Sequence, residues 1–341
     1  ENSELTYEKK HEFNVGVDLG FLHNRINLAA DYYRRNNFDL IGVINTQGAG
    51  GTIAKYANIA SMRSSGIELT LSTQNIKKKG FSWNTDFIFS KTKNEITDLK
   101  SHANVLDLIS GNGFGREGYP VRALFSIPFA GLTEDGLPTF INQDGQRTIS
   151  TLNFQEYEKL GFLKYEGPTD PTITGSFGNI LTYKNFKLNV FLTYSFGNVI
   201  RLDPVFSSAY SDLDAMPKEF KNRWMKAGDE NTTNIPTIVS YRMNQQYAYL
   251  NMAYNAYNYS DVRIADGGFI RLKEISLSYD LPAKVLNFFR LNKLQFKIQA
   301  TNLFLLYADS KLNGQDPEFF RSGGVSTPVP RQFTFTIRLG L

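Results

Sequence analysis

The sequence predicts an all-β protein, a transmembrane antiparallel β-barrel of which about nine strands are present. Two observations predict this class: segments of about ten residues alternate between apolar and polar side chains, and the connections between them are alternately short and long. A third observation supports it. The chain has 27 Phe and 18 Tyr, an aromatic share of 14%, and aromatic side chains favour strands and membrane interfaces.

The clearest alternation lies in the last segment, residues 331–341. Its apolar side chains alternate with polar ones or glycine, and they are Phe333, Phe335, Ile337, Leu339 and Leu341. One face of this strand therefore suits lipid and the other suits water. The same alternation predicts strands around residues 13–19, 26–32, 67–71, 83–89, 172–183, 186–194, 275–279 and 294–300.

The lengths of the connections separate a barrel from a soluble β-sandwich, whose strands alternate in the same way. Brief connections (20–24, 75–80, 184–185, and a longer one at 281–292) take turns with long ones at 36–64, 91–172, 198–267 and 304–331. An outer-membrane barrel has short periplasmic turns and long extracellular loops, so this order favours the barrel. The same topology predicts a periplasmic C-terminus and places residue 1 outside.

Aromatic residues near the strand ends predict two girdles at the membrane interfaces. Those on the long-loop side are Tyr32, Tyr33, Tyr194 and Phe196. Those on the short-turn side are Phe81, Trp83, Tyr183 and Phe186. Ordinary packing at a sheet edge is the competing interpretation.

An odd number of strands predicts that the sheet continues elsewhere. Bacterial single-chain barrels have even strand numbers, and an open sheet in lipid leaves edge N–H and C=O groups without partners, at several kcal/mol each. We therefore expect residues 1–341 to be the C-terminal part of one barrel domain, with more strands upstream or on another chain. Because the sequence begins at Glu1 without a signal peptide, we also expect an export signal upstream.

Composition and charge exclude several classes of function. The net charge is +4 and Lys and Arg are scattered, so no nucleic-acid surface is predicted. The absence of cysteine excludes disulfides and thiolate metal sites, and no apolar run approaches the roughly 20 residues of a spanning helix. His11, His23 and His102 lack metal-ligand spacing and no G-x-S-x-G motif occurs, so we expect no enzyme.

Three glycine-containing patterns are interpreted as turns. Gly113, Gly115 and Gly118 form G-x-G-x-x-G, but neither the strand nor the helix of a dinucleotide-binding unit surrounds them. Residues 133–136 and 142–145 resemble pieces of a calcium loop, yet the spaced acidic ligands and the closing glutamate are missing. Asp-Gly is foremost a turn signal. We expect no cofactor, with a loop-bound calcium ion as the alternative.

Residues 241–259 are the strongest candidate for ligand contact because tyrosine and asparagine are interleaved there. Flat aromatic faces and amide groups suit a polar, ring-containing ligand such as a sugar. Packing between loops or against a partner is the competing interpretation, since tyrosine is equally common there. Together with one tryptophan, the candidate ligand or lid-contact residues are Trp224, Tyr241, Tyr247, Tyr249, Tyr254, Tyr257 and Tyr259.

Several separate motifs resemble the SusC/RagA-like TonB-dependent outer-membrane transporters of Bacteroidetes. They are residues 8–10 before 16–22 and 25–33, Asn58 with 65–69 (SGIEL), 116–121 (REGYPV), 223–224 with 228–229 and 235–236, 269–279 (FIRLKEISLSY) with 281–282, 302–304 (NLF), 316–318 (DPE) and 330–333 (PRQF). The motifs follow the family's order over nearly the whole chain. Arg122 departs from the pattern, where a glycine is usual, and so does Leu341, where an aromatic residue is common.

The resemblance implies a barrel of about 22 strands with an N-terminal plug domain. It also implies active import, driven by TonB, of oligosaccharide or peptide nutrients across the outer membrane. The implied partners are a SusD-like surface lipoprotein, the TonB complex through an N-terminal part that this chain lacks, and the glycan or peptide ligand. The alternative hypothesis is a non-transporting barrel that serves as a scaffold or subunit of a surface assembly.

Overall fold

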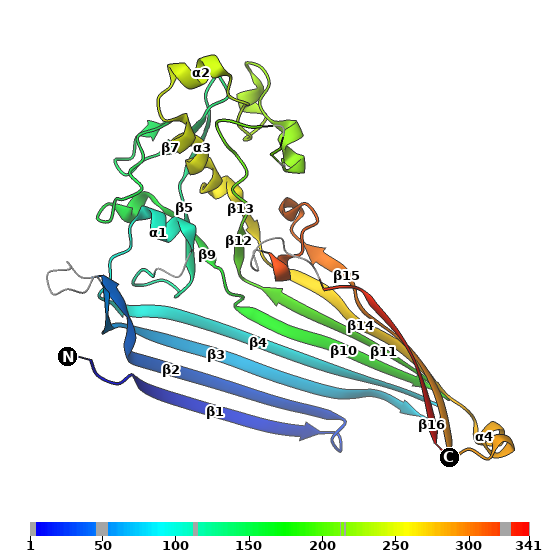
Figure 1. Cartoon of the computed structure of the whole chain (residues 1–341). Helices are drawn as coiled ribbons and strands as arrows, with labels where there is room; N and C mark the ends of the chain where they lie inside the picture. The colour runs from blue at the N-terminus through cyan, green and yellow to red at the C-terminus, as the bar shows by residue number, and fades with distance from the viewer. Residues whose placement is uncertain are drawn as a thin grey trace.

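The computed structural model describes residues 5–45, 54–111, 115–211, 213–214, 216–320 and 329–340. Nine long strands form one antiparallel sheet whose order follows the chain (Figure 1). They are β1 (Lys9–Phe21), β2 (Ile26–Asn45), β3 (Ala54–Lys78), β4 (Phe81–Leu99), β10 (Ile173–Tyr183), β11 (Phe186–Phe196), β14 (Phe269–Asp280), β15 (Lys293–Ala308) and β16 (Gln332–Gly340). The expected all-β class is confirmed. Each predicted segment overlaps one of these strands, and Leu341 lies outside the described residues.

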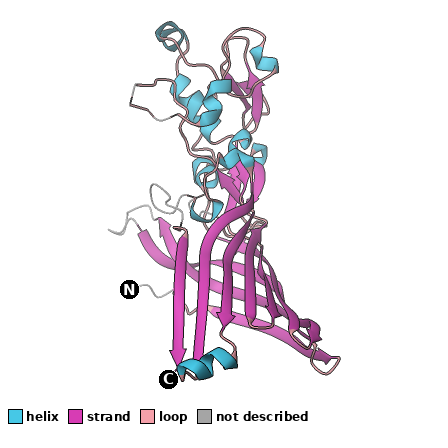
Figure 2. Ribbon diagram, turned by 90° about the vertical axis from the view of Figure 1, so that its right-hand side faces the viewer, coloured by secondary structure: helices cyan, strands magenta, loops and turns pink. Residues whose placement is uncertain are grey.

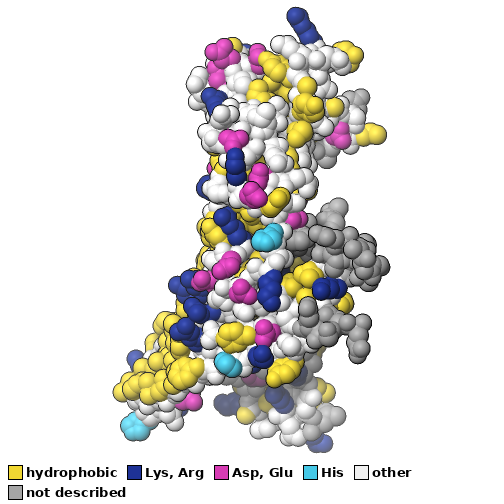
Figure 3. Space-filling view, turned by 90° about the vertical axis from the view of Figure 1, so that its left-hand side faces the viewer, with side chains coloured by type: hydrophobic (Ala, Val, Ile, Leu, Met, Phe, Trp, Pro, Cys, Tyr) yellow, Lys and Arg dark blue, Asp and Glu magenta, His cyan; other side chains and the backbone are white. Residues whose placement is uncertain are grey.

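The register brings apolar side chains of all nine strands onto one face. One cross-strand row contains Leu19, Leu28, Leu71, Phe87, Phe177, Leu192 and Leu272. A second row contains Leu181, Leu188, Leu277, Ile298 and Phe335. Many of these side chains are exposed, Phe335 by 62%. We call this surface the apolar band; part of it is the yellow area at the lower left of Figure 3.

The opposite face of the sheet, which we call the polar face, carries hydrogen-bonding side chains. Glu274 is a centre on this face. Its carboxylate accepts hydrogen bonds from Asn189 Nδ2 (3.1 Å) on β11, Gln299 Nε2 (3.3 Å) on β15 and the Ser276 hydroxyl (3.2 Å). The sheet therefore has one face suited to lipid and one suited to water, as the alternation predicts.

The connection predicted at residues 36–64 is largely strand, so that prediction is wrong. β2 and β3 continue to pair as far as Asn45 and Ala54, with an irregular register between Asn37 and Ile41. Backbone hydrogen bonds continue beyond the point where the apolar and polar side chains stop alternating regularly. In β2 and β3, alternation therefore located only the part of the strand that lies within the apolar band.

The described parts of residues 100–172 and 197–268 pack together above one end of the sheet and form what we call the long-loop region (Figures 1 and 2). Its first half contains α1 (Val105–Ser110), β5 (Ala123–Ser126), β6 (Phe129–Leu132), β7 (Pro138–Ile141), β8 (Arg147–Thr148), η1 (Leu160–Phe162) and β9 (Lys164–Pro168). Its second half contains β12 (Val199–Arg201), η2 (Lys218–Asn222), η3 (Asp229–Asn231), α2 (Tyr241–Gln246), α3 (Leu250–Asn258), η4 (Asp261–Arg263) and β13 (Ile264–Asp266). The two halves share one buried core, which includes Phe125, Phe140 and Tyr254.

The remaining short elements lie at both ends of the sheet. The connection between β14 and β15 contains α4 (Ala283–Phe289), a helix that the sequence did not predict, at the end opposite the long-loop region (Figure 1). The connection between β15 and β16 contains η5 (Ser310–Leu312) and η6 (Pro317–Phe319). None of the helices in the described ranges is long and apolar enough to cross a membrane.

An aromatic row crosses five strands at the α4 end of the sheet, on the face of the apolar band. Its members are Phe81, Tyr183, Phe186, Tyr279 and Phe296. The ring centroids of Phe186 and Tyr279 lie 4.5 Å apart. At the other end, Tyr33 lies opposite Gly66 on the polar face, so its assignment to a girdle beside Tyr32 is wrong. Neighbouring residues of a strand point to opposite faces, and only one of the two can face lipid.

Candidate functional site

A cavity of about 670 Å³ lies between the long-loop region and the polar face of the sheet. This volume is typical of a ligand site. Its polar lining comes from both long connections, the sheet and η6, and includes Arg122, Thr174, Ser195, Asn198, Arg201 and Glu318. The lining offers both hydrogen-bond donors and acceptors, so the cavity can hold a polar ligand or a segment of one.

The strand register and one glycine turn position the part of the cavity nearest the sheet. Thr174 and Ser195 face each other across β10 and β11 on the polar face. Gly197 then has a φ of 85°, a conformation that favours glycine, and turns the chain toward β12. Asn198, the next residue, lines the cavity, and its buried Oδ1 accepts no hydrogen bond from any described residue. The lining therefore contains one buried acceptor without a donor among the described residues.

Arg271 fixes η6 against the polar face. Its Nη2 donates to both carboxylate oxygens of Asp316, each at 2.6 Å, and its Nε lies 3.0 Å from Glu318 Oε2. The side chains of Arg271 and Asp316 are 4% and 7% exposed. The two residues come from separate sequence motifs, 269–279 and 316–318. The motifs therefore meet in space and position Glu318 at the cavity.

Arg201 joins the two halves of the long-loop region. It is buried on β12, and its guanidinium donates to the carbonyl of Phe125, the hydroxyl of Ser126 (3.0 Å) and the carbonyl of Ser260 (3.2 Å). It also lies over the ring of Tyr259, 5.5 Å from its centroid. Tyr259, one of the predicted contact residues, therefore packs against a structural arginine beside the cavity.

Tyr254 and Tyr257 belong to the core of the long-loop region. They are 1% and 2% exposed. The Tyr254 hydroxyl donates to the Thr237 carbonyl, and the Tyr257 ring makes an edge contact with Phe206, centroid to centroid 4.9 Å. Burial raises the pKa of both phenols above the ordinary value of 10.0. Their contacts correspond to packing between loops, the competing interpretation of this tyrosine-rich segment.

Trp224 and Tyr247 converge on the turn at Asp135 and Gly136. A Cβ on Gly136 would lie 2.5 Å from the Trp224 ring, so the ring packs directly on this turn. The Tyr247 hydroxyl lies 3.3 Å from Asp135 Oδ2. Trp224 Nε1 donates to Glu230 at 3.1 Å. Both side chains therefore hold a turn together.

Tyr241 and Tyr249 are the exposed members of the predicted set, at 82% and 66%. Tyr241 begins α2, which lies at the top of the long-loop region in Figure 1. Tyr249 precedes α3 with a φ of 70°. The seven predicted residues are thus divided among the core, a turn, a cation contact and the outer surface. The cavity residues were missed, although polar residues at the long-loop ends of β10 and β11 were a usable signal.

The two calcium-like segments form hydrogen-bonded turns. The Gly136 N–H donates to the Thr133 carbonyl (2.9 Å), and the Gly145 N–H donates to the Asn142 carbonyl (3.0 Å). Asp144 forms an ion pair with Lys159 at 2.8 Å. Within the described ranges, no group of three or more His, Asp or Glu side chains is arranged to hold a metal. Gly113 of the G-x-G-x-x-G pattern lies outside those ranges.

Comparison with known proteins identifies relatives of one kind. No family model matches the sequence. Over 93% of its length the chain is 25% identical to TonB-dependent receptor P3 of Formosa agariphila, and over its whole length it is 27% identical to TonB-dependent receptor SusC of Bacteroides thetaiotaomicron. The chain resembles the SusC-type TonB-dependent receptors. It covers 31% and 32% of those two proteins, so it spans about a third of their length.

Solved structures show the same fold for this SusC-like chain. A chain of the RagAB peptide transporter superposes on 99% of it with a TM-score of 0.75 at 22% identity, and the match covers 35% of that chain. The RagAB peptide importer in its "open-open" state gives the same TM-score at 21% identity. The expected resemblance to SusC/RagA-like receptors is confirmed. These relatives are named as receptors and transporters, and none of them as an enzyme.

Proposed function

We propose that residues 1–341 are the C-terminal part of the barrel domain of a SusC/RagA-like TonB-dependent receptor. In this proposal the whole protein imports oligosaccharide or peptide nutrients across the outer membrane. The observation that carries it is the two-faced sheet: nine antiparallel strands expose an apolar band on one face and present hydrogen-bonding groups on the other. A wall between lipid and an aqueous lumen requires this arrangement.

The sheet would be one part of a closed barrel of about 22 strands. β1 and β16 form the two edges of the described sheet. In lipid, those edges require pairing, because unpaired backbone groups there cost several kcal/mol each. We infer that the long-loop region is extracellular and that the α4 end, where β16 ends, is periplasmic, because outer-membrane barrels carry their long loops outside.

The cavity beneath the long-loop region would contact cargo on its way into the lumen. Its mixed donors and acceptors suit the amides of a peptide and the hydroxyls of a glycan. A SusD-like lipoprotein would cover the long-loop region, where Tyr241 and Tyr249 are exposed for lid contact. TonB would act through a plug domain N-terminal to this chain. A scaffold without transport is the competing function.

The test uses the full-length protein in its native outer membrane. Uptake of labelled oligopeptides and oligosaccharides is measured with and without functional TonB, and affinity purification assays co-purification of a SusD-like lipoprotein. We expect TonB-dependent uptake of one ligand class and a stable complex. A complex without uptake would favour the scaffold, and the absence of both would refute the proposal.

A matched pair of variants tests the cavity. Asn198→Ala removes the buried acceptor that no described residue satisfies, and Asn234→Ala changes an exposed asparagine of the long-loop region that does not line the cavity. We expect the first to raise the half-saturating ligand concentration about fivefold, because a hydrogen bond contributes about 1 kcal/mol. The second should leave uptake unchanged. Equal effects would place the ligand elsewhere.

A further inference from the structure

The apolar band changes into a basic surface at its long-loop end, on β2, β3 and β4. Four successive cross-strand rows of this face run toward the long-loop end. The first is apolar throughout (Val17, Ala30, Leu69 and Phe89), and the second has one lysine (Val15, Tyr32, Ile67 and Lys91). The third and fourth contain the remaining basic residues (Phe13, Arg34, Ser65 and Lys93; His11, Asn36, Arg63 and Glu95). Successive rows lie about 7 Å apart along a strand. The surface therefore changes from apolar to basic within about 14 Å.

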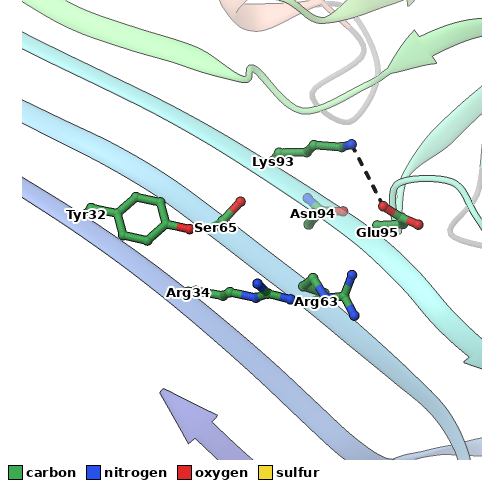
Figure 4. Close-up of a pocket in the computed structure, with 7 residues that line it drawn as sticks. All are labelled: Tyr32, Arg34, Arg63, Ser65, Lys93, Asn94 and Glu95. Carbon is green, nitrogen blue, oxygen red and sulfur yellow. Dashed lines mark ion pairs between the residues drawn. The ribbon is translucent and has the colours of Figure 1, made fainter. Parts of the chain in front are cut away.

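Arg34, Arg63 and Lys93, which we call the basic patch, surround a hollow of about 250 Å³. Ser65 is the small residue between them and pairs with Arg34 on one side and Lys93 on the other. The Arg34 side chain extends toward Arg63, and Lys93 extends toward Glu95 (Figure 4). All three cationic side chains are exposed. Figure 3 shows dark blue basic side chains directly above the yellow area.

The charges of the basic patch are poorly neutralised by the protein itself. Arg34 has no carboxylate partner among the described residues, and Arg63 Nε donates only to the neutral Asn36 Oδ1, at 3.3 Å. Lys93 Nζ lies 3.8 Å from Glu95, and both side chains are exposed, so this ion pair is weak. Three cations against one carboxylate leave an excess of two positive charges.

On the polar face of the same strands, next to the basic patch, the arginine is paired with a carboxylate. There Arg35 makes two contacts with Glu12, from Nε at 3.1 Å and from Nη2 at 3.2 Å. The two neighbouring arginines of β2 therefore differ. Arg35, on the polar face, has a carboxylate partner, whereas Arg34, on the face of the apolar band, has none among the described residues. An unneutralised cluster of like charges on a sheet is unfavourable and gains from an external anion.

We infer that the basic patch binds the phosphate of a membrane lipid whose acyl chains lie on the apolar band. This inference rests on the proposed membrane location. Guanidinium groups match phosphate in shape and charge, and Tyr32 and Ile67 in the adjoining row provide an apolar surface for the first part of the chains. The continuity of the patch with the band selects a lipid phosphate over a free anion.

The test measures lipid retention by the full-length protein with native mass spectrometry after extraction in a neutral detergent. The probes are phosphatidic acid, diacylglycerol with the same acyl chains, and inorganic phosphate as competitor. The variant combines Arg34→Gln, Arg63→Gln and Lys93→Gln. Its matched control combines Lys77→Gln, Lys78→Gln and Lys79→Gln, which removes three exposed charges at the other end of the sheet. A difference in SDS-gel mobility between unheated and heated samples checks that each variant folds. If the triple variant does not fold, Arg34→Gln alone is used.

We expect the patch variant to lose affinity for phosphatidic acid about tenfold, from three exposed charge interactions. The control variant should bind like wild type, diacylglycerol should not be retained, and equimolar inorganic phosphate should not displace the lipid. Unchanged binding by the patch variant, an equal loss in the control, or displacement by phosphate would each overturn the inference. A protein that fails to enter lipid vesicles at all would instead refute the proposed function.

Discussion

The sheet and the long-loop region treat their apolar side chains in opposite ways. In the sheet, Phe333 and Phe13 on the edge strands are 74% and 62% exposed. In the long-loop region, Phe125 and Phe140 are fully buried. The long-loop region encloses its core as a water-soluble domain does, whereas the sheet exposes an apolar band that, in the proposed membrane location, would face lipid. In that location one chain would meet two solvents, with the boundary near the long-loop ends of the strands.

The largest expected effect comes from emptying the core of the long-loop region. Phe140→Ala removes a ring buried against Phe129 and should destabilise this region by about 3–5 kcal/mol. Pulse proteolysis of the full-length protein in increasing urea measures the change. Phe333→Ala is the matched control, since its ring is exposed. Equal losses of stability would contradict the contrast between the two regions.

A charge introduced on the apolar band should destabilise the sheet and leave the long-loop region unaffected. Phe335→Arg is expected to destabilise the proposed lipid-embedded barrel by about 2–3 kcal/mol, because a guanidinium on a lipid-facing band is poorly solvated. Folding into vesicles at graded urea concentrations measures the effect. Thr334→Arg places the same side chain on the polar face of the same strand and should cost far less. The assignment of the two faces fails if both variants fold equally well.

Breaking the clamp between the sheet and η6 should have an intermediate effect. Asp316→Ala leaves the buried Arg271 with Glu318 as its remaining carboxylate. We expect a loss of about 2 kcal/mol, below the usual cost of breaking a buried pair, because that second partner stays. Hydrogen exchange of residues 309–320 should rise while exchange in β4 stays constant. Unchanged exchange in both would show that η6 does not depend on this pair.

The smallest expected effect is a loss of stability at high pH that is confined to the long-loop region. The folded-state pKa values of Tyr254 and Tyr257 are raised by burial. The folded protein therefore retains protons that the unfolded chain releases near pH 10, so stability is present below that pH and falls above it. Alkaline unfolding followed by phenolate absorbance measures this loss. Tyr254→Phe should reduce it, and Tyr241→Phe, at an exposed position, should not.

The sequence predicted the sheet better than the candidate site. Alternation located the strands because successive side chains of a two-faced strand point to opposite faces. The residue type therefore alternates between apolar and polar, as in Phe333 and Thr334. It could not tell that β2 and β3 extend to Asn45 and Ala54, because backbone hydrogen bonds form regardless of side-chain pattern. The cavity residues lie far apart in the chain, and no local pattern joins Arg122 to Glu318.

By itself, the sequence determined the class of fold, the two faces of the clearly alternating segments and the resemblance to SusC-type receptors, because these depend on local periodicity and on ordered motifs. Only the tertiary structure decided the burial of Tyr254 and Tyr257, the meeting of Arg271 with Asp316, and the gathering of Arg34, Arg63 and Lys93 beside the apolar band. Those features depend on strand register and on contacts between distant segments. The physical reason is that the polarity of a residue reflects the solvent or core that its own side chain faces, which can be read residue by residue. Which side chains become its neighbours depends on how distant strands and loops pair.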